Sequence, residues 1–262
     1  MGPARGRGAV STKTQEVIDL ARRLRLPYLR EAADDVLTTA KAQRWDPAEA
    51  LRVLLEAEVE GREQSMTENR RRRARFPAGK TFDAWDPGRS SISASTQDAL
   101  ATLEWVQRHE NLVVCGPSGT GKSHLLEALG HAAVDARCSV AWFSIEDLGV
   151  LVRRHRVDDS VAKALAPMLR SDVIVVDDIG LLPVSEEAAE GLYRLVDAAY
   201  ERRSVAISSN LHPSGFDELM PPSLATALVD RLLHHAHVVQ TSGESIRLQD
   251  ATSGKGVKPL TK

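Results

Sequence analysis

The sequence predicts an α/β domain built on a parallel sheet that helices cover on both faces, preceded by a small all-helical domain. Two observations predict this fold class. Apolar runs of strand length alternate with helical patterns from about residue 96 onward, and apolar residues recur at helical spacing over residues 12–68. Strands that alternate with helices pair in parallel within a covered sheet. The expected parts are a disordered tip (1–11), a helical front domain (12–75), a linker (76–95), the α/β domain (96–248) and a flexible tail (249–262).

Composition limits the class of protein. The chain has 262 residues, 42% of them apolar, and a net charge of −2, which is enough for one buried core and a smaller satellite domain. Residues 1–80 hold 17 Lys and Arg against 12 Asp and Glu, and this basic excess is a weak indication of a nucleic-acid partner. A disulfide framework needs more than Cys115 and Cys138, and no apolar run is long enough to span a membrane. We therefore expect a cytoplasmic protein with no membrane partner.

Three helical patterns make up the predicted front domain. The first ends where Pro27 interrupts it, and the second follows directly. The third begins at Asp46, which can cap it, while Pro47 fits the first turn and Glu49 can close a capping box. The apolar positions of the three patterns are Val17, Leu20, Ala21 and Leu24, then Leu29, Ala32, Ala33, Val36 and Leu37, then Leu51, Leu54, Leu55 and Val59.

An arginine run ends the front domain. Such a run is often the solvated end of a helix. Alternatively, its guanidinium groups contact nucleic-acid phosphates, and affinity would then fall steeply with salt. The sequence leaves both readings open, so the candidates for DNA contacts are Arg70, Arg71, Arg72, Arg73 and Arg75.

Strands and helices alternate through the rest of the chain, without an internal repeat. The predicted strands are Leu112–Cys115, Ser139–Phe143, Val173–Val176, Val205–Ser208 and Ala236–Gln240. The predicted helices are Ser123–Val134, Glu146–Arg154, Ser160–Arg170, Glu186–Arg202 and Leu224–His234.

The turn after the first strand, GPSGTGKS, fits the pattern G-x-x-x-x-G-K-[ST] in full. Its glycines let several backbone N–H groups point at phosphate oxygens, Lys122 is expected to reach the β- and γ-phosphates, and the Ser123 hydroxyl is expected to bind Mg²⁺. A glycine-rich turn without a ligand is disfavoured, because a buried strand precedes the motif and an amphipathic helix follows it. The predicted nucleotide-binding residues are Gly116, Pro117, Ser118, Gly119, Thr120, Gly121, Lys122, Ser123 and His124.

Two carboxylates follow the apolar run Val173–Val176, where the strand would end beside the P-loop. Asp177 can hold Mg²⁺ there, and Asp178 can polarise an attacking water. The alternative is a strand that merely ends in a polar turn. Together with the P-loop, the pair predicts hydrolysis of the nucleotide as well as binding.

Two further polar positions carry weaker patterns. Asn210 follows the strand Val205–Ser208 and could orient the water, although asparagine is common in strand-ending turns. Arg231 lies late in a helical pattern, where it could be a surface ion pair. Alternatively, it is an arginine finger that reaches the γ-phosphate of a neighbouring subunit.

Three histidines, His234, His235 and His237, lie across a helix end and a strand start. Their side chains are expected to diverge, and no cysteine or carboxylate set completes a site. We therefore expect no metal there.

With these pieces in order, the chain resembles the IstB-like family, the AAA+ helper ATPases of bacterial insertion-sequence transposition. It is similar, more distantly, to the DnaC helicase loaders. The resemblance covers about residues 12–248. Besides the P-loop and the acidic strand end, it is carried by Asn111-Leu112, His124, Ala128-Leu129-Gly130, Tyr200-Glu201-Arg202-Arg203-Ser204, Ser208-Ser209-Asn210, Asp230-Arg231-Leu232-Leu233-His234-His235 and Gly243-Glu244-Ser245-Ile246-Arg247.

The resemblance implies an AAA+ three-layer sandwich. Because only about 14 residues follow Leu248, no C-terminal helical lid domain is expected. It also implies that Asn210 is the sensor residue and Arg231 the finger that acts in trans. Finally, it implies ATP and Mg²⁺ as cofactors and ATP-dependent homo-oligomer assembly on duplex DNA. The oligomer would recruit or stimulate a transposase of the same insertion element, or, for a DnaC-type loader, a replicative helicase.

The chain departs from the family pattern at two positions. Ser123 stands where related proteins often have threonine and keeps the hydroxyl. Asp178 stands where the acidic strand end is often Asp-Glu, and the shorter side chain would set the carboxylate back by roughly 1 Å, which can cost about 10² in rate. The hypothesis that follows is slow or strongly partner-dependent hydrolysis.

Other classes fit less well. A P-loop kinase would need an acceptor site, and a GTPase would need a base-reading Asn-Lys-x-Asp that the sequence lacks. A non-enzymatic DNA-binding module would not need Lys122.

Overall fold

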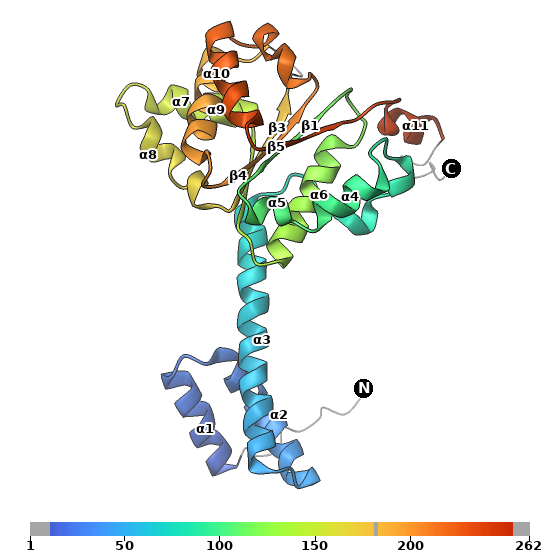
Figure 1. Ribbon diagram of the computed structural model, residues 1–262. Helices are drawn as coiled ribbons and strands as arrows, with labels where there is room; N and C mark the ends of the chain where they lie inside the picture. Colours follow the sequence, from blue (N-terminus) through green and yellow to red (C-terminus); the bar gives the residue numbers. More distant parts are fainter. Residues whose placement is uncertain (1–10, 181–182, 254–262) are drawn as a thin grey trace, which may run out of the picture. The chain divides into compact units, whose positions relative to one another are not determined.

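The computed structural model describes residues 11–180 and 183–253 and divides into two compact units, Met1–Asn69 and Arg70–Lys262 (Figure 1). Residues 1–10 of the expected tip and 254–262 of the expected tail lie outside the described residues. Across the described part of the chain, no helix combines the length and the apolar character that crossing a bilayer requires.

The first unit is helical, with α1 (Thr12–Arg23), α2 (Pro27–Gln43) and most of α3 (Pro47–Ala74), whose end belongs to the second unit. The Asp46 carboxylate caps α3 by accepting the Ala48 N–H at 2.8 Å. Glu49, expected to complete a capping box, instead binds Arg52 through both carboxylate oxygens. The small core of this unit consists of Ala21, Leu29, Ala33 and Leu54.

A buried carboxylate ties α2 to α3. Leu26 has no side chain that can cap the start of α2, and Glu58 of α3 takes that role by accepting the N–H groups of Tyr28 at 2.9 Å and Leu29 at 3.0 Å. Arg62 donates to the other oxygen of Glu58 at 2.5 Å. Glu58 is 4% exposed, so α2 depends on a charge supplied by another helix.

The second unit is built on a five-stranded parallel sheet, as predicted, in the order β2-β3-β4-β1-β5. Each predicted strand is present, with ends that shift by a residue or more at four of the five. The strands are β1 (Asn111–Cys115), β2 (Val140–Ser144), β3 (Val173–Ile179), β4 (Ser204–Ser209) and β5 (Ala236–Gln240).

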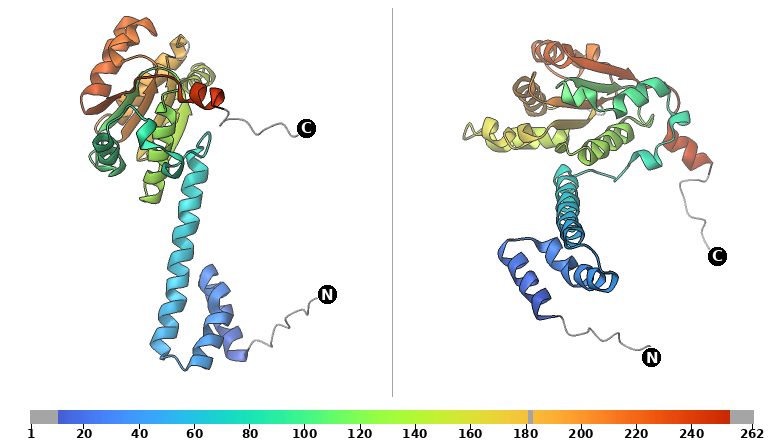
Figure 2. Two further views of the ribbon diagram at one scale, coloured as in Figure 1. Left: turned by 90° about the vertical axis from the view of Figure 1, so that its right-hand side faces the viewer. Right: turned by 60° about the horizontal axis from the view of Figure 1, so that its bottom comes forward.

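Helices cover both faces of the sheet, which Figures 1 and 2 show from three directions. Alternate residues of β1 enter opposite cores, because side chains alternate along a strand. Val113 packs into the core under α7, α9 and α10, and Val114 packs into the core under α4, α5 and α6. These helices are α4 (Ala94–Ala101), α5 (Glu104–Gln107), α6 (Lys122–Asp135), α7 (Ile145–His155), α9 (Glu186–Ala199) and α10 (Pro222–Leu233).

Shorter elements connect these parts. The single helix predicted over Ser160–Arg170 is wrong, because Pro167, which has no N–H for a helical hydrogen bond, separates α8 (Val161–Leu165) from the 3₁₀ turn η3 (Met168–Arg170). The remaining described elements are η1 (Phe82–Ala84), η2 (Pro87–Arg89), η4 (Pro213–Glu218) and α11 (Ile246–Thr252).

The β3 strand continues beyond its predicted end. Asp177 and Asp178 therefore lie inside β3, at an irregularity where its register with β4 shifts between Val176 and Ile179. Asp178 has a φ of 63°, a left-handed conformation that is unusual for a residue other than glycine. This bulge turns two successive carboxylates toward the carboxyl edge of the sheet.

Candidate nucleotide site

The P-loop joins β1 to α6 as predicted. Gly116 has a φ of +141°, and a side chain at that position would collide with the backbone of Thr241. The next helix begins at Lys122, so its unpaired N–H groups face the loop, where the helix dipole favours an anion. The loop therefore has the geometry of a phosphate cradle.

Lys122 points into the loop. Its Nζ donates to Gly116 O, Pro117 O and Asn210 Oδ1, each at 2.8 Å, although the residue is only 7% exposed. Burial lowers the pKa of Lys122, and the negative charges of Asp178 and Asp177 oppose that shift. The structure thus places Asn210 in contact with the P-loop lysine, at the carboxyl edge of the sheet where the sequence predicted it.

Ser123 and Asp177 are also in contact, with the Ser123 hydroxyl donating to Asp177 Oδ1 at 2.9 Å. A hydroxyl and a carboxylate on adjacent elements are oxygen ligands of the kind that Mg²⁺ takes, so the residues present fit the predicted ion. The buried Ser208 donates to the same Asp177 oxygen, and its own Oγ accepts the Asp178 N–H at 3.0 Å. The sequence analysis named Ser208 in the Ser208-Ser209-Asn210 segment but gave it no role.

Asp178 faces the cavity with an exposed side chain. Desolvation by the surrounding protein raises the pKa of Asp178, and the negative charges of Asp177 and Glu146 raise it further. A raised pKa is typical of carboxylates that accept protons during catalysis.

Lys122, Ser123, Asp178 and Asn210 line one cavity of about 410 Å³, which is within the size range of small-molecule sites, and Asp177 reaches this site through its contact with Ser123. Arg247 of α11 lines it too, and its positive charge contributes to the lowered pKa of Lys122. The Ile246 N–H, donated to Gly119 O at 2.9 Å, fixes α11 to the P-loop. Arg247 is one of the residues that carry the family resemblance, but the sequence gave it no role. It lies in a short segment after the last strand, where no local pattern indicates that its side chain enters the cavity.

The segment expected to be a linker, residues 76–95, also lines this cavity. The Trp85 ring packs edge-on against His124 with centroids 5.1 Å apart, and Trp85 Nε1 donates to Gln97 Oε1 at 2.7 Å. His124 Nε2 lies 3.2 Å from Thr81 O, and burial lowers the pKa of His124. His124 therefore joins the P-loop to the segment that precedes the α/β domain.

Arg231 does not line the cavity of its own chain. It lies on α10, where its Nε is 2.7 Å from Asp197 Oδ1 and its Cζ is 5.4 Å from the centroid of the Tyr193 ring.

The expectation for the histidines was wrong in two respects. The side chains of His234 and His235 do not diverge, since their ring centroids are 4.1 Å apart, and a carboxylate joins them. Ligand atoms of Glu201, His234 and His235 lie within 4.8 Å of one another, on an exposed surface. His237 is separate and pairs with Glu110 at 2.7 Å.

The predicted arginine run is divided between two surroundings. Arg71 forms an ion pair with Asp135 at 2.5 Å, and Arg72 is exposed. Arg70, Arg73 and Arg75 line a hollow beside β2 instead. Arg71, Arg72, Arg73 and Arg75 are all exposed, as a helix end in solvent would be, and Arg70 is half-buried.

Comparison with known proteins agrees with this geometry. The family model described as "IstB-like ATP binding protein" matches residues 19–254. The chain is 34% identical over 236 residues to the "Insertion sequence IS21 putative ATP-binding protein" of Pseudomonas aeruginosa, covering 88% of each chain. It is 31% identical over 229 residues to the corresponding IS232 protein of Bacillus thuringiensis subsp. berliner, covering 87% of this chain and 92% of the relative.

Solved structures share the fold. The crystal structure of DnaI aligns with a TM-score of 0.53 at 15% identity, over 66% of this chain and 94% of that one. The replication initiator DnaA, bound to AMPPCP and single-stranded DNA, aligns with a TM-score of 0.53 at 18% identity, over 70% of this chain and 56% of that one. The predicted α/β P-loop fold of the AAA+ type is confirmed.

Proposed function

The chain belongs to the IstB-like ATP-binding family, and we propose from this membership and from its site that it is an ATPase that assists DNA transposition. In this proposal it binds Mg·ATP and assembles as a homo-oligomer on duplex DNA. The assembly recruits or stimulates a transposase of the same insertion element. Hydrolysis of ATP to ADP and phosphate then releases it.

The observation that carries the proposal is the meeting of Lys122, Asn210, Ser123 and Asp177 at one edge of the sheet. Bound Mg²⁺ would neutralise charge on the β- and γ-phosphates. Ser123 and Asp177 would hold the ion, and Ser208 orients the Asp177 carboxylate. The Lys122 ammonium exchanges its loop carbonyls for phosphate oxygens without leaving the loop.

Hydrolysis is assigned to the chain's own polar groups. Asp178 would orient and polarise the attacking water, and Asn210 would position it against the γ-phosphate. Arg247, which faces the same cavity, would contact the phosphates of its own subunit. The short Asp178 side chain keeps basal turnover low until a partner is present.

Assembly is assigned to Arg231. Because this residue lies outside its own nucleotide cavity, a γ-phosphate contact would have to be made with a neighbouring subunit. Such a contact exists only in the oligomer with ATP bound, and it is the differential contact by which ATP can shift an assembly equilibrium.

The choice of client depends on the relatives. Those with most of their length covered carry insertion-sequence names, which favours a transposase. The more distant sequence resemblance to the DnaC helicase loaders gives a second candidate, a helicase loader of that type. Co-purification distinguishes them: the first predicts retention of the element's transposase, and the second predicts retention of a replicative helicase.

The experiment that tests the proposal is Lys122→Ala, with the exposed Lys163→Ala on α8 as the matched control. We expect the Lys122 variant to lose Mg·ATP binding and oligomer formation on duplex DNA, and the control to keep both. Assembly on DNA by the Lys122 variant at wild-type level would contradict the proposal and favour a non-enzymatic DNA-binding module.

A further inference from the structure

Two hollows adjoin along β2, the edge strand of the sheet. One, of about 620 Å³, is lined by β2 itself, by Arg70 and Arg73 at the end of α3, and by Arg170 of η3. The other, of about 480 Å³, is lined by Arg154 of α7. Both share Arg75, Trp142, Phe143 and Met168, so they form one continuous surface, here called the β2-edge groove.

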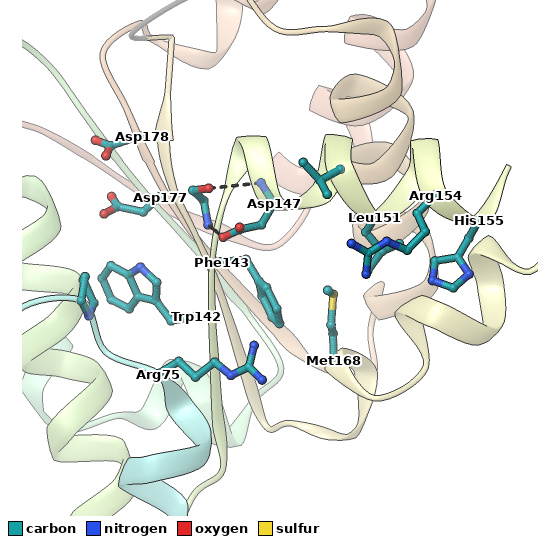
Figure 3. A pocket seen from close by; sticks show the side chains of 13 residues that line it. Arg75, Trp142, Phe143, Asp147, Leu151, Arg154, His155, Met168, Asp177 and Asp178 are labelled. Carbon is teal, nitrogen blue, oxygen red and sulfur yellow. Dashed lines mark hydrogen bonds between the residues drawn. The ribbon is translucent and has the colours of Figure 1, made fainter.

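Cations come into this groove from more than one element. Figure 3 shows Arg75 on one side of Phe143 and Met168, and Arg154 with His155 on the other. Between them, Trp142, Phe143 and Met168 give a largely apolar floor. Asp177 and Asp178 lie at the opposite end of the hollow.

The arginines of the groove are unpaired, whereas Arg71 and Arg153 beside them have carboxylate partners. Over residues 11–180 and 183–253, no ion pair or hydrogen bond is made by the guanidinium groups of Arg70, Arg73, Arg75, Arg154 and Arg170. By contrast, Arg153, next to Arg154 on α7, reaches Glu187 at 3.9 Å, and Arg71 pairs with Asp135. Arg71 and Arg153, which do not line the groove, thus have carboxylate partners, and the five arginines that line it have free donors.

We propose that the β2-edge groove binds the sugar–phosphate backbone of duplex DNA through Arg70, Arg73, Arg75, Arg154 and Arg170. This inference rests on the proposed function for the identity of the partner. It adds the surface on the ATPase unit and two residues, Arg154 and Arg170, outside the arginine run.

The groove fits a phosphate backbone better than a protein segment. Guanidinium groups bind phosphate oxygens through two parallel hydrogen bonds, and several separate arginines match a ligand with a charge on every unit. The apolar floor can contact sugars, which carry no charge. An acidic extended peptide added to the edge of β2 is the competing occupant, but it would need carboxylates matched to five separate positions.

The groove also touches the nucleotide site. Among the residues that the structure describes, only Asp178 lines both the groove and the P-loop cavity. A backbone bound at the arginine end would therefore lie in the same hollow as the carboxylate assigned to the attacking water. DNA stimulation of turnover is the expected consequence.

The test uses the full chain with saturating Mg·ATP and a fluorescently labelled duplex, titrated over a series of NaCl concentrations. The variants are Arg154→Gln and Arg170→Gln, and the matched control is Arg153→Gln. Each groove variant should lower affinity by about tenfold and reduce the slope of log affinity against log salt by about 0.9, the value for one lost phosphate contact. Both should bind a fluorescent ATP analogue normally, which shows that they are folded.

Each outcome has a distinct meaning. If both groove variants keep the wild-type affinity and the wild-type salt slope, the proposal that DNA binds in the groove is overturned, and the proposed function is left intact. If the groove variants bind DNA normally but lose the binding of a labelled glutamate-rich peptide that the wild-type chain retains, the groove binds a protein segment, and the proposal is overturned. A wild-type chain that does not bind the duplex at all would contradict the proposed function itself.

Discussion

The Nε of Arg231 lies 2.7 Å from Oδ1 of Asp197, and the Cζ of Arg231 lies over the Tyr193 ring, 5.4 Å from the ring centroid. Arg231 Nη1 makes one further, longer contact, with Ala227 O at 3.4 Å. The side chain is thus fixed near its base, and its terminal amino groups remain largely free for another ligand. Asp197 and Tyr193 lie on α9, so two helices position this arginine.

We expect Asp197→Asn to lower the maximal DNA-stimulated turnover and leave the KM for ATP unchanged. The pair is exposed enough to contribute less than about 1 kcal/mol to folding, so a large effect would report positioning of Arg231 and not stability. Steady-state kinetics of the assembled protein measure this, and Asp197→Glu should recover part of the rate. A raised KM with normal turnover would show that Asp197 does not act through Arg231.

Arg231→Ala should bind Mg·ATP normally and turn over roughly 10³-fold more slowly in the presence of DNA. Asp178→Asn should be similarly inactive, because it lacks the carboxylate assigned to the water. Mixing the two variants should restore turnover, since some interfaces then combine an intact cavity with an intact finger. Two inactive variants that stay inactive when mixed would contradict an arginine acting in trans.

Asp178→Glu should raise DNA-stimulated turnover, by up to about 10², because the longer side chain moves the carboxylate toward the γ-phosphate. Asp177→Glu is the control, and should lower turnover by disturbing the contact with Ser123. Single-turnover hydrolysis measures the chemical step directly. Unchanged or slower hydrolysis in Asp178→Glu would remove the proposed cause of slow turnover.

Acid should inhibit hydrolysis earlier than an ordinary aspartate would allow. Desolvation and the charges of Asp177 and Glu146 raise the pKa of Asp178, and the deprotonated carboxylate is the form that polarises water. As pH falls, kcat/KM for Mg·ATP, which reports the groups of the nucleotide-free protein, should therefore begin to drop at a pH above the usual aspartate range. A pH–rate profile that is flat down to that range would show that Asp178 is not the titrating base.

Glu58→Gln should loosen the start of α2, at a cost of about 1–3 kcal/mol for the buried hydrogen bonds. Burial acts to raise the pKa of Glu58, but hydrogen bonds from Leu29, Arg62 and Tyr28 outweigh it, and the net shift is downward. This stabilisation is therefore present above the ordinary glutamate pKa and is lost as pH falls through the lowered value. Hydrogen exchange over α2 measures the effect, with the exposed Glu60→Gln as control; equal protection in the two variants would contradict it.

The parts of the fold that could be predicted are those encoded by local patterns. Runs such as Val173–Val176 predict a strand because a strand buried on both faces must be apolar throughout, and the P-loop predicts its own strand–turn–helix context. The bulge at Asp178 was not predicted, because it depends on the register of β3 with β4. The break at Pro167 was not predicted either, although a proline inside a helical pattern is a local signal for it.

The parts that could not be predicted are contacts between residues far apart in the chain. Ser208 acts on Asp177 only because β4 pairs with β3, and Arg247 enters the cavity only because Ile246 bonds to Gly119. Trp85 lies in the stretch that was predicted to be a linker, and nothing in that stretch indicates its packing against His124. The pairing of Arg231 with Asp197 likewise has no signal in either segment alone.

The central claim is that ATP held by the P-loop joins subunits on DNA, and sedimentation velocity of the purified chain tests it most directly. With duplex and saturating Mg·ATP together, we predict a protein assembly on the duplex whose mass is several times that of the 28.6 kDa chain. We predict that this assembly is lost when ATP is omitted. A chain that sediments as a monomer under all of these conditions would contradict the account.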